Sequence, residues 1–367
     1  MVRYWLLIGM LHEKNIDHLL TIHEIYHEPN IHEYARGREI LARYPDAKLI
    51  EVKTHNQIPE LFGFAGAVED WLWNKKNVLI LGAKHSLSAR PNTRSSHWVA
   101  PSQSNGCAMS CSYCYVPRRK GYANPITIFV NIEKIMGYLE RHAGRQGKKL
   151  IPDHIDPEYW VYEIGENGDC SADVAICDNV KDLIHLFSGL PNAKLTFATK
   201  FVNRDLLTYD PQHKTRIRFS LMPHQMSKLV DVRTTPISDR IAVMNEFRQA
   251  GYEVNASFAP VIFYEGWLED WRKLFDEMNN VLDEETKRQL ATEIIFLTHN
   301  QQLHEVNMDW HPKAEEVLWR PDIQQVKYSQ TGQRNVRYKN NLKRELVNEL
   351  LNLCTEMIPY CSIRYAF

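Results

Sequence analysis

The sequence has no long apolar run and no excess of charge of either sign. No stretch approaches the roughly 18 consecutive apolar residues of a membrane-spanning helix. The apolar run near the N-terminus lacks the small-residue cleavage site of a signal peptide, so none is expected. Lys plus Arg number 44 against 45 for Asp plus Glu, which excludes a generally basic nucleic-acid coat. Any nucleic-acid surface must therefore be a local patch.

Cysteines are few and unevenly placed. Of the seven in the 367 residues, three fall within eight positions, namely Cys107, Cys111 and Cys114. An odd total with one tight cluster does not match a disulfide framework. It indicates metal ligation in a reducing, cytoplasmic compartment. Cys177, Cys354 and Cys361 are interpreted as buried free thiols.

Short strand-like runs alternate with helical patterns along most of the chain. Apolar residues at helical spacing, with Ser238 as a cap and Gly251 as an end, predict one helix over residues 238–251. Such alternation predicts an α/β fold with a parallel sheet, here a partial (β/α) barrel. The strand-like runs are 47–52, 77–83, 126–132, 159–166, 193–200, 216–222, 253–263 and 292–299.

Three segments are predicted from this pattern. Residues 1–98 form an N-terminal α/β segment, 99–300 the partial barrel, and 301–367 a C-terminal, helix-containing segment that contacts the substrate. The Ser-, Asn- and Pro-rich stretch over residues 86–106 is interpreted as a linker or loop.

The cysteine cluster has the spacing C-x3-C-x2-C in GCAMSCSYCYVPRR. Thiolates suit iron–sulfur clusters or zinc, but structural zinc sites want four ligands, usually as two close pairs. Three thiolates on a 4Fe–4S cluster leave one iron open for S-adenosylmethionine, whose cleavage then releases a 5′-deoxyadenosyl radical. This pattern is typical of the radical S-adenosylmethionine superfamily. A zinc knuckle with a distant histidine, or three free thiols, are the alternatives.

Longer blocks of the sequence resemble spore photoproduct lyases from about residue 27 to the end. The blocks include CSYCYVPRRKGYANPITIFVNIEKIM, LTFATKFVNRDLL and FAPVIFYEGWLEDWRKLF. That family uses a 4Fe–4S cluster and S-adenosylmethionine to cleave the C–C bond of a thymine photodimer in DNA. The resemblance implies a lyase for DNA repair, with irradiated DNA as substrate and an electron donor such as flavodoxin or ferredoxin.

The resemblance also implies roles for individual residues. Cys107, Cys111 and Cys114 match the cluster ligands, and Cys170 matches the cysteine that returns a hydrogen atom to the product radical. Tyr113 and Tyr115 match tyrosines that relay hydrogen. Lys200, Ser220 and Ala259 match positions that contact S-adenosylmethionine. The family's Cys-Thr-Ser-Asp is Cys170-Ser171-Ala172-Asp173 here, and Gly165 and Glu166 resemble the motif with which other superfamily members bind the cofactor's amino group.

Basic residues in two places could contact DNA. Arg118, Arg119 and Lys120 follow the cluster, and Arg337, Tyr338 and Lys339 lie in a basic C-terminal segment related to one that inserts at the lesion in the family. A solvated charged face is the alternative for both.

Two alternative functions remain open, and two histidine patterns are not interpreted as metal sites. A relative acting on another nucleic-acid lesion, a peptide or a small molecule is the first alternative function, and a non-catalytic, metal-stabilised nucleic-acid-binding protein is the second. The HExxH pattern at residues 23–27 is not interpreted as a zinc protease, because Pro29 follows closely and the motif works only on a helix. His299, His304 and His311 fit no standard metal site and are interpreted as ordinary polar histidines.

Overall fold

The computed structural model describes residues 19–62, 68–116, 121–328, 332 and 334–367. These residues divide into two units. The first contains described residues of 1–109, 119–197 and 201–215, and the second those of 110–118, 198–200 and 216–367. The three segments predicted from the sequence pattern remain a prediction. No helix among the described residues is long and apolar enough to cross a membrane.

The first unit contains a five-stranded sheet around the apolar run VLILG. All five residues of this strand are buried, as is common for strands of a parallel sheet that is covered on both faces. Four strands are parallel, and β6 joins the sheet antiparallel to β7. In sheet order they are β2 (Lys48–Glu51), β1 (Glu24–His27), β3 (Val78–Gly82), β7 (Ile126–Phe129) and β6 (Ser104–Asn105).

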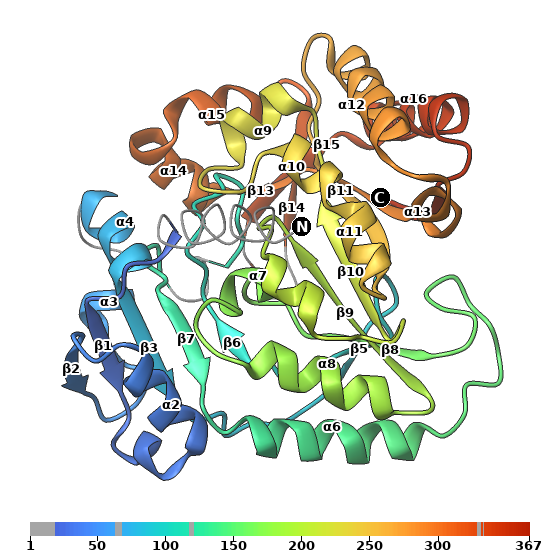
Figure 1. Cartoon of the computed structure of the whole chain (residues 1–367). Coiled ribbons are helices and arrows are strands. Elements are labelled where there is room, and N and C mark those ends of the chain that lie inside the picture. Colours follow the sequence, from blue (N-terminus) through green and yellow to red (C-terminus); the bar gives the residue numbers. More distant parts are fainter. Residues whose placement is uncertain (1–18, 63–67, 117–120, 329–331, 333) are drawn as a thin grey trace, which may run out of the picture. The chain divides into compact units, whose positions relative to one another are not determined.

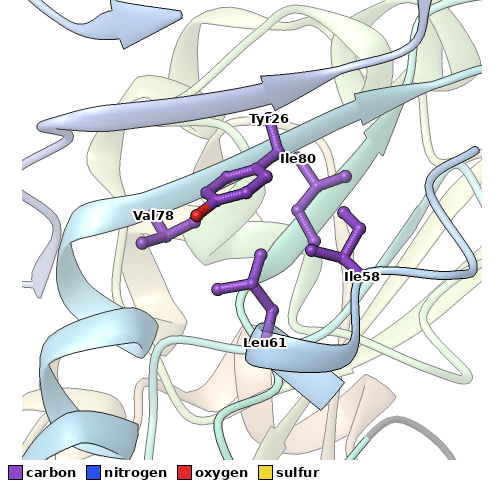
Figure 2. Packing of buried hydrophobic residues seen from close by; sticks show 5 residues of the cluster. All are labelled: Tyr26, Ile58, Leu61, Val78 and Ile80. Carbon is purple, nitrogen blue, oxygen red and sulfur yellow. The ribbon is translucent and has the colours of Figure 1, made fainter. Parts of the chain in front are cut away.

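An apolar core packs against β1 and β3. Its side chains come from the two strands and from the segment around α3 (Pro59–Phe62), and none is more than 9% exposed. Figure 2 shows these side chains, which are Tyr26, Ile58, Leu61, Val78 and Ile80. Because residues 24–27 form a strand, the HExxH pattern does not lie on a helix. Histidines four residues apart in a strand are separated by about 13 Å, too far to share one zinc ion.

A second group of strands follows in the same unit. β8 pairs in parallel with β9 and β5, and β5 pairs antiparallel with β4. The strands are β4 (Arg90–Pro91), β5 (Trp98–Val99), β8 (Trp160–Glu163) and β9 (Ala193–Thr199), whose last two residues belong to the second unit. The stretch over residues 86–106, predicted to be a linker or loop, lies mostly outside regular structure but also adds short strands to both strand groups. It contains three two-residue strands and several buried polar side chains, because its backbone groups complete the edges of both strand groups.

The helices of the first unit fall mainly between its strands. The longer ones, α6 and α8, contact each other and run side by side (Figure 1). The regular helices are α2 (Ala35–Arg43), α4 (Val68–Asn77), α6 (Ile132–Gln146), α7 (Cys170–Asp173) and α8 (Asn179–Gly189), with 3-10 helices η1 (Pro29–Glu33) and η2 (Arg204–Thr208).

The second unit alternates parallel strands with helices, as the sequence predicts. Neighbouring strands pair in the order β10, β11, β12, β16. The strands are β10 (Thr215–Ser220), β11 (Glu253–Val261), β12 (Ala291–Phe296) and β16 (Ser362–Ala366), and Thr215 itself belongs to the first unit. The helices are α9 (His224–Val230), α10 (Ile237–Ala242), α11 (Met244–Gln249), α12 (Trp267–Val281), α13 (Glu284–Gln289) and α16 (Asn340–Met357).

The predicted helix over residues 238–251 is two helices, α10 and α11. The chain departs from regular helix at Val243, and Pro236 rather than Ser238 precedes the first helical residue. Proline is suited to a helix start because its φ is already fixed and it needs no hydrogen-bond acceptor. Gly251 does lie at the end, with a φ of 90°.

A small antiparallel sheet and two helices complete the second unit. The sheet order is β13 (Thr298–Asn300), β15 (Arg334–Tyr338), β14 (Gln324–Tyr328). The strands β14 and β15 form a hairpin in which Tyr328 lies opposite Arg334. Between β13 and β14 lie α14 (Gln301–Trp310) and α15 (Pro312–Leu318).

Candidate functional site

The three clustered cysteines are partly exposed, whereas the other four cysteines of the chain are buried. Cys107 follows Gly106, whose φ is 93° and whose hypothetical Cβ would lie 2.3 Å from the Pro125 carbonyl oxygen. Only glycine fits such a position without strain. The turn before Cys107 therefore requires glycine at position 106, because a side chain there would clash with the Pro125 carbonyl.

First-unit groups hold the beginning of the cluster loop, which we define as residues 107–114. Lys75 is buried, and its Nζ donates to the carbonyl oxygens of Cys107 at 3.1 Å and Met109 at 3.2 Å. The Met109 N–H points at the Cys107 sulfur at 3.4 Å. N–H groups directed at a thiolate stabilise its negative charge, and in iron–sulfur proteins they tune the potential.

Second-unit backbone holds the rest of the cluster loop. The Ser110 N–H donates to the Val232 carbonyl and the Ser112 N–H to the Val230 carbonyl, each at 3.0 Å. The Cys114 N–H closes a turn onto the Cys111 carbonyl at 3.1 Å. Cys111 and Cys114 thus lie on a short backbone turn whose neighbouring amides are already bonded.

The donor set fits an iron–sulfur cluster better than a single zinc ion. Among the residues that the structure describes, no three His, Cys, Asp or Glu side chains are arranged to hold one metal ion. A single zinc needs four ligands that all lie about 2.0–2.3 Å from one centre. A four-iron cube binds each thiolate through a different iron, so three separated thiols on one loop suit it.

Tyr113 is held by a buried ion pair. Its hydroxyl donates to Asp231, and the guanidinium of Arg240 contacts the other Asp231 oxygen at 3.1 Å with both side chains fully buried. Burial, and then the negative charge of Asp231, raise the pKa of Tyr113 well above its usual value. The tyrosine therefore keeps its O–H, as a residue that passes on a hydrogen atom must. Tyr115 is 42% exposed.

Two predicted cofactor residues lie together beside Tyr113. Lys200 Nζ is 3.4 Å from the Ser220 hydroxyl and 5.6 Å from the centre of the Tyr113 ring. Arg240 donates to the Ser220 carbonyl at 2.7 Å, so the buried ion pair also fixes the end of β10. A partly exposed ammonium at a strand end is suited to a carboxylate such as that of a methionine group.

Ala259 lies on the neighbouring strand β11, two residues beyond Ser257, which pairs with Ser220. Its side chain is half-buried. The second unit therefore contains the second and third cluster cysteines, both tyrosines, and all three predicted cofactor positions Lys200, Ser220 and Ala259.

Cys170 lies in the first unit at the start of α7 and is completely buried. The Asp169 carboxylate caps the helix, accepting from the N–H groups of Ser171 and Ala172 at 3.1 and 3.3 Å. A Cβ on Gly165 would lie 3.4 Å from the Cys170 sulfur and 3.2 Å from Glu163 Oε1. A side chain at position 165 would therefore crowd Glu163 and Phe197 beside the thiol.

Glu166, predicted to contact the cofactor's amino group, pairs with Arg90 in this structure. It also accepts a hydrogen bond from the Asn167 side-chain amide at 3.4 Å. The roles of Gly165 and Glu166 in cofactor binding remain a prediction.

Tyr338, predicted from the sequence as a DNA contact, is buried in the structure. The side chain is 1% exposed, and its hydroxyl accepts from the Phe263 N–H at 2.8 Å. A buried, hydrogen-bonded ring is not exposed for stacking on a DNA base in this structure, and a DNA contact by Tyr338 remains a prediction. Its neighbour Lys339 is exposed and donates to the Asp322 carbonyl, and Arg337 is half-buried. Arg118, Arg119 and Lys120 lie outside the described residues.

The hairpin exposes a different aromatic residue. Tyr328 at the end of β14 is 67% exposed, next to exposed Lys327 and opposite exposed Arg334. The register places both tyrosines on the same face of the hairpin, but Tyr338 lies opposite buried Gln324 at the start of β14, whereas Tyr328 lies at the far end of that strand. Sequence reasoning chose the tyrosine nearest to the most basic residues and missed Tyr328. The YSQTG run, a turn signal that follows it directly, was the available clue.

Comparisons with known proteins agree on one family. A family model described as spore photoproduct lyase matches residues 20–367. The spore photoproduct lyase of Bacillus subtilis (strain 168) is 25% identical over 349 residues, covering 93% of this chain and 97% of the relative. That of Geobacillus sp. (strain Y412MC61) is 24% identical over 350 residues, with the same coverage of 93% and 97%.

Solved structures of spore photoproduct lyases share the fold. One complexed with dinucleoside spore photoproduct, and one mutant with bound AdoMet and the same dinucleoside, each match with a TM-score of 0.83 at 22% identity. Each match covers 95% of this chain and 99% of the solved chain. The predicted α/β fold of partial-barrel type is thereby confirmed.

Proposed function

Because this chain belongs to the spore photoproduct lyase family, we propose that it repairs a thymine photodimer in DNA by cleaving the C–C bond between the two bases. It is a radical S-adenosylmethionine lyase that uses a 4Fe–4S cluster. The observation that carries the proposal within the molecule is the set of three partly exposed thiols on the cluster loop. The cluster loop is held at both ends while the other four cysteines are buried.

Cys107, Cys111 and Cys114 would hold the cluster, and Lys200 would pair with the methionine carboxylate of the cofactor. When bound there, the cluster and S-adenosylmethionine supply a 5′-deoxyadenosyl radical. Cys170, which is completely buried, would give a hydrogen atom to the product radical. The Tyr113 O–H, held by Asp231, is positioned to relay hydrogen, with Tyr115 beside it in sequence.

The exposed end of the hairpin would contact DNA. Lys327 and Arg334 would meet phosphates, and the Tyr328 ring would stack beside the displaced lesion. The near-neutral net charge of the chain is compatible with such a local patch. None of the seven cysteines, all of them described in the structure, forms a disulfide, which supports a reducing, cytoplasmic location with a small electron-transfer protein such as flavodoxin or ferredoxin as reductant.

The proposal is tested with anaerobically reconstituted protein, dithionite, S-adenosylmethionine and dinucleoside spore photoproduct. Wild-type protein is expected to form 5′-deoxyadenosine and repaired thymine. Cys111→Ala is expected to lose both products, Cys170→Ala to keep 5′-deoxyadenosine but divert the repaired product, and Cys354→Ala, a buried cysteine elsewhere, to match wild type. Cofactor cleavage without repair of this lesion would assign the enzyme another substrate. If the protein contains no iron and does not cleave the cofactor, the result favours the alternative of a non-catalytic nucleic-acid-binding protein.

A matched pair of tyrosine variants tests the DNA surface. Tyr328→Ala is expected to weaken binding to single-stranded or lesion-containing DNA by roughly 10-fold, since one aromatic stack is worth about 1–3 kcal/mol. Tyr338→Phe removes only a buried hydroxyl and should leave DNA affinity unchanged while lowering stability by about 1 kcal/mol. Equal DNA affinities for Tyr328→Ala and wild type would place the contact elsewhere.

A further inference from the structure

Asn307 connects the C-terminal helices of the second unit to the cluster loop. It lies on α14 and is completely buried. Its side-chain Nδ2 donates to the Ser112 carbonyl oxygen at 2.6 Å and to Glu315 Oε1 at 2.6 Å. Both partners are acceptors only, which requires the NH2 group of the amide, and not its oxygen, to face them.

The hydrogen bond from Asn307 restrains the backbone of the cluster loop at Ser112. It lies between Cys111 and Tyr113, so its carbonyl belongs to the peptide that joins it to Tyr113. On its other edge the Ser112 N–H and hydroxyl donate to the Val230 carbonyl at 3.0 and 3.4 Å. The Val230 carbonyl thus holds the Cys111–Ser112 peptide, and Asn307 holds the Ser112–Tyr113 peptide. Neither peptide plane can rotate without breaking a hydrogen bond.

Glu315 fixes Asn307 in turn. It is 3% exposed and is contacted by His299 Nε2 at 3.0 and 3.2 Å and by His304 Nδ1 at 2.6 Å. The His304 ring stacks on Trp319 at 4.3 Å with planes 4° apart. Burial raises the pKa of Glu315, but the hydrogen bonds and charge of His299, with hydrogen bonds from Asn307 and His304, outweigh it and lower the pKa overall. Glu315 is therefore a carboxylate that accepts from all three neighbours.

We propose that Asn307, oriented by Glu315, His299 and His304, is a positioning residue that sets the conformation of the cluster loop at Cys111, Tyr113 and Cys114. The inference rests on the proposed function, since it concerns how this chain holds its cluster. Residues outside the direct ligands typically change metal affinity or activity by 10–100-fold when altered. Asn307 acts through its hydrogen bond to the Ser112 backbone.

Two variants and one control test this role in the full-length, reconstituted protein. Asn307→Asp keeps size and shape but turns a carboxylate oxygen toward the Ser112 carbonyl and Glu315. Asn307→Ala removes both hydrogen bonds. Met308→Ala changes the next residue of the same helix, which is 54% exposed, and serves as the control. Circular dichroism and thermal melts identify any variant that does not fold.

The first readout is the rate at which an iron chelator removes iron from the anaerobic protein. Both Asn307 variants are expected to lose iron roughly 10-fold faster than wild type, with Asn307→Asp at least as fast as Asn307→Ala, while Met308→Ala matches wild type. The second readout is the electron paramagnetic resonance spectrum of the reduced cluster with S-adenosylmethionine. A broadened or mixed spectrum in the Asn307 variants shows a cluster loop that no longer adopts one conformation.

Folded Asn307 variants with wild-type iron loss and wild-type spectra would overturn the inference. If Asn307→Asp fails to fold, the same two measurements on Asn307→Ala and Asn307→Ser test whether Asn307 positions the cluster loop. Failure of the proposed function is distinct, because wild-type protein would then contain no cluster or would not cleave S-adenosylmethionine.

Discussion

Two buried glutamates, one in each unit, bind histidine side chains and yet support different parts of the molecule. In the first unit Glu28 accepts from the His55 N–H at 3.0 Å, from His55 Nδ1 at 2.7 Å and from the Ala83 N–H at 2.8 Å. These contacts join the ends of β1 and β3 within one sheet. In the second unit Glu315 binds two histidines but passes its constraint through Asn307 to the cluster loop. The same pairing of groups thus serves the fold in one place and the proposed site in the other.

A third buried carboxylate shows what the histidines contribute. Asp173, three residues after Cys170, accepts from Gln103 Nε2 and the Ser104 hydroxyl, which are neutral groups. Burial outweighs these two hydrogen bonds and raises the pKa of Asp173 to about 7. Burial also raises the pKa of Glu28, but the hydrogen bonds from His55 and Ala83 and the charge of His55 lower it to about 2. The charge and number of the partners decide whether a buried acid is ionised.

The largest effect is expected at Glu28. Glu28→Ala leaves the His55 side chain and two buried N–H groups without their acceptor, and it should lower the free energy of unfolding by about 4 kcal/mol. The wild-type contribution is present above the ordinary glutamate pKa and is lost as the pH falls from about 4.5 toward 2. Chemical denaturation at pH 7 and pH 3 measures both.

Glu51→Ala, an exposed position on β2, is the control and should change stability by less than about 0.5 kcal/mol. Any Glu28→Ala protein that remains folded should lose iron at the wild-type rate, since its contacts end within the sheet. Faster iron loss from Glu28→Ala would show that Glu28, like Glu315, affects how the cluster is held.

A change of opposite sign is expected at Asp173. A folded-state pKa of about 7, above the unfolded value of 3.8, means that ionisation opposes folding. Asp173→Asn keeps an acceptor for Gln103 and Ser104, and it should stabilise the protein by up to about 4 kcal/mol at pH 8. The gain should shrink as the pH falls through 7 and vanish near pH 4. A stability difference that does not depend on pH would contradict the raised pKa.

The smallest effect on stability is expected at Glu315. Glu315→Gln keeps one acceptor oxygen but turns an NH2 group toward a histidine donor, which should cost about 1–2 kcal/mol. Its effect on iron loss should nevertheless approach that of Asn307→Ala. Glu316→Gln, exposed and next in sequence, should match wild type in both measurements. A Glu315→Gln protein with normal iron retention would show that Asn307 needs no support from the carboxylate.

Sequence reasoning succeeded where the signal is local. The apolar runs predicted β2, β3 and β7 to β12, but not β1, β14, β15 or β16. Cys107, Cys111 and Cys114 stand out through spacing alone. It failed where partners are distant in the chain. The histidines His299 and His304 fit no metal spacing, and nothing in their order shows that they bind Glu315, 16 and 11 residues away. The long segment before the cluster looked like a linker because its strands are only two residues long and need their neighbours to form.

The sequence by itself determined the alternation of strands and helices, the three-thiol cluster motif and the family resemblance, because each depends on residues close together in the chain. Tertiary structure decided which polar side chains are ionised, which tyrosine of the hairpin reaches solvent, and that Asn307 bonds to Ser112 across 195 positions. Burial and hydrogen-bond partners set those properties, and both arise only when distant segments pack together.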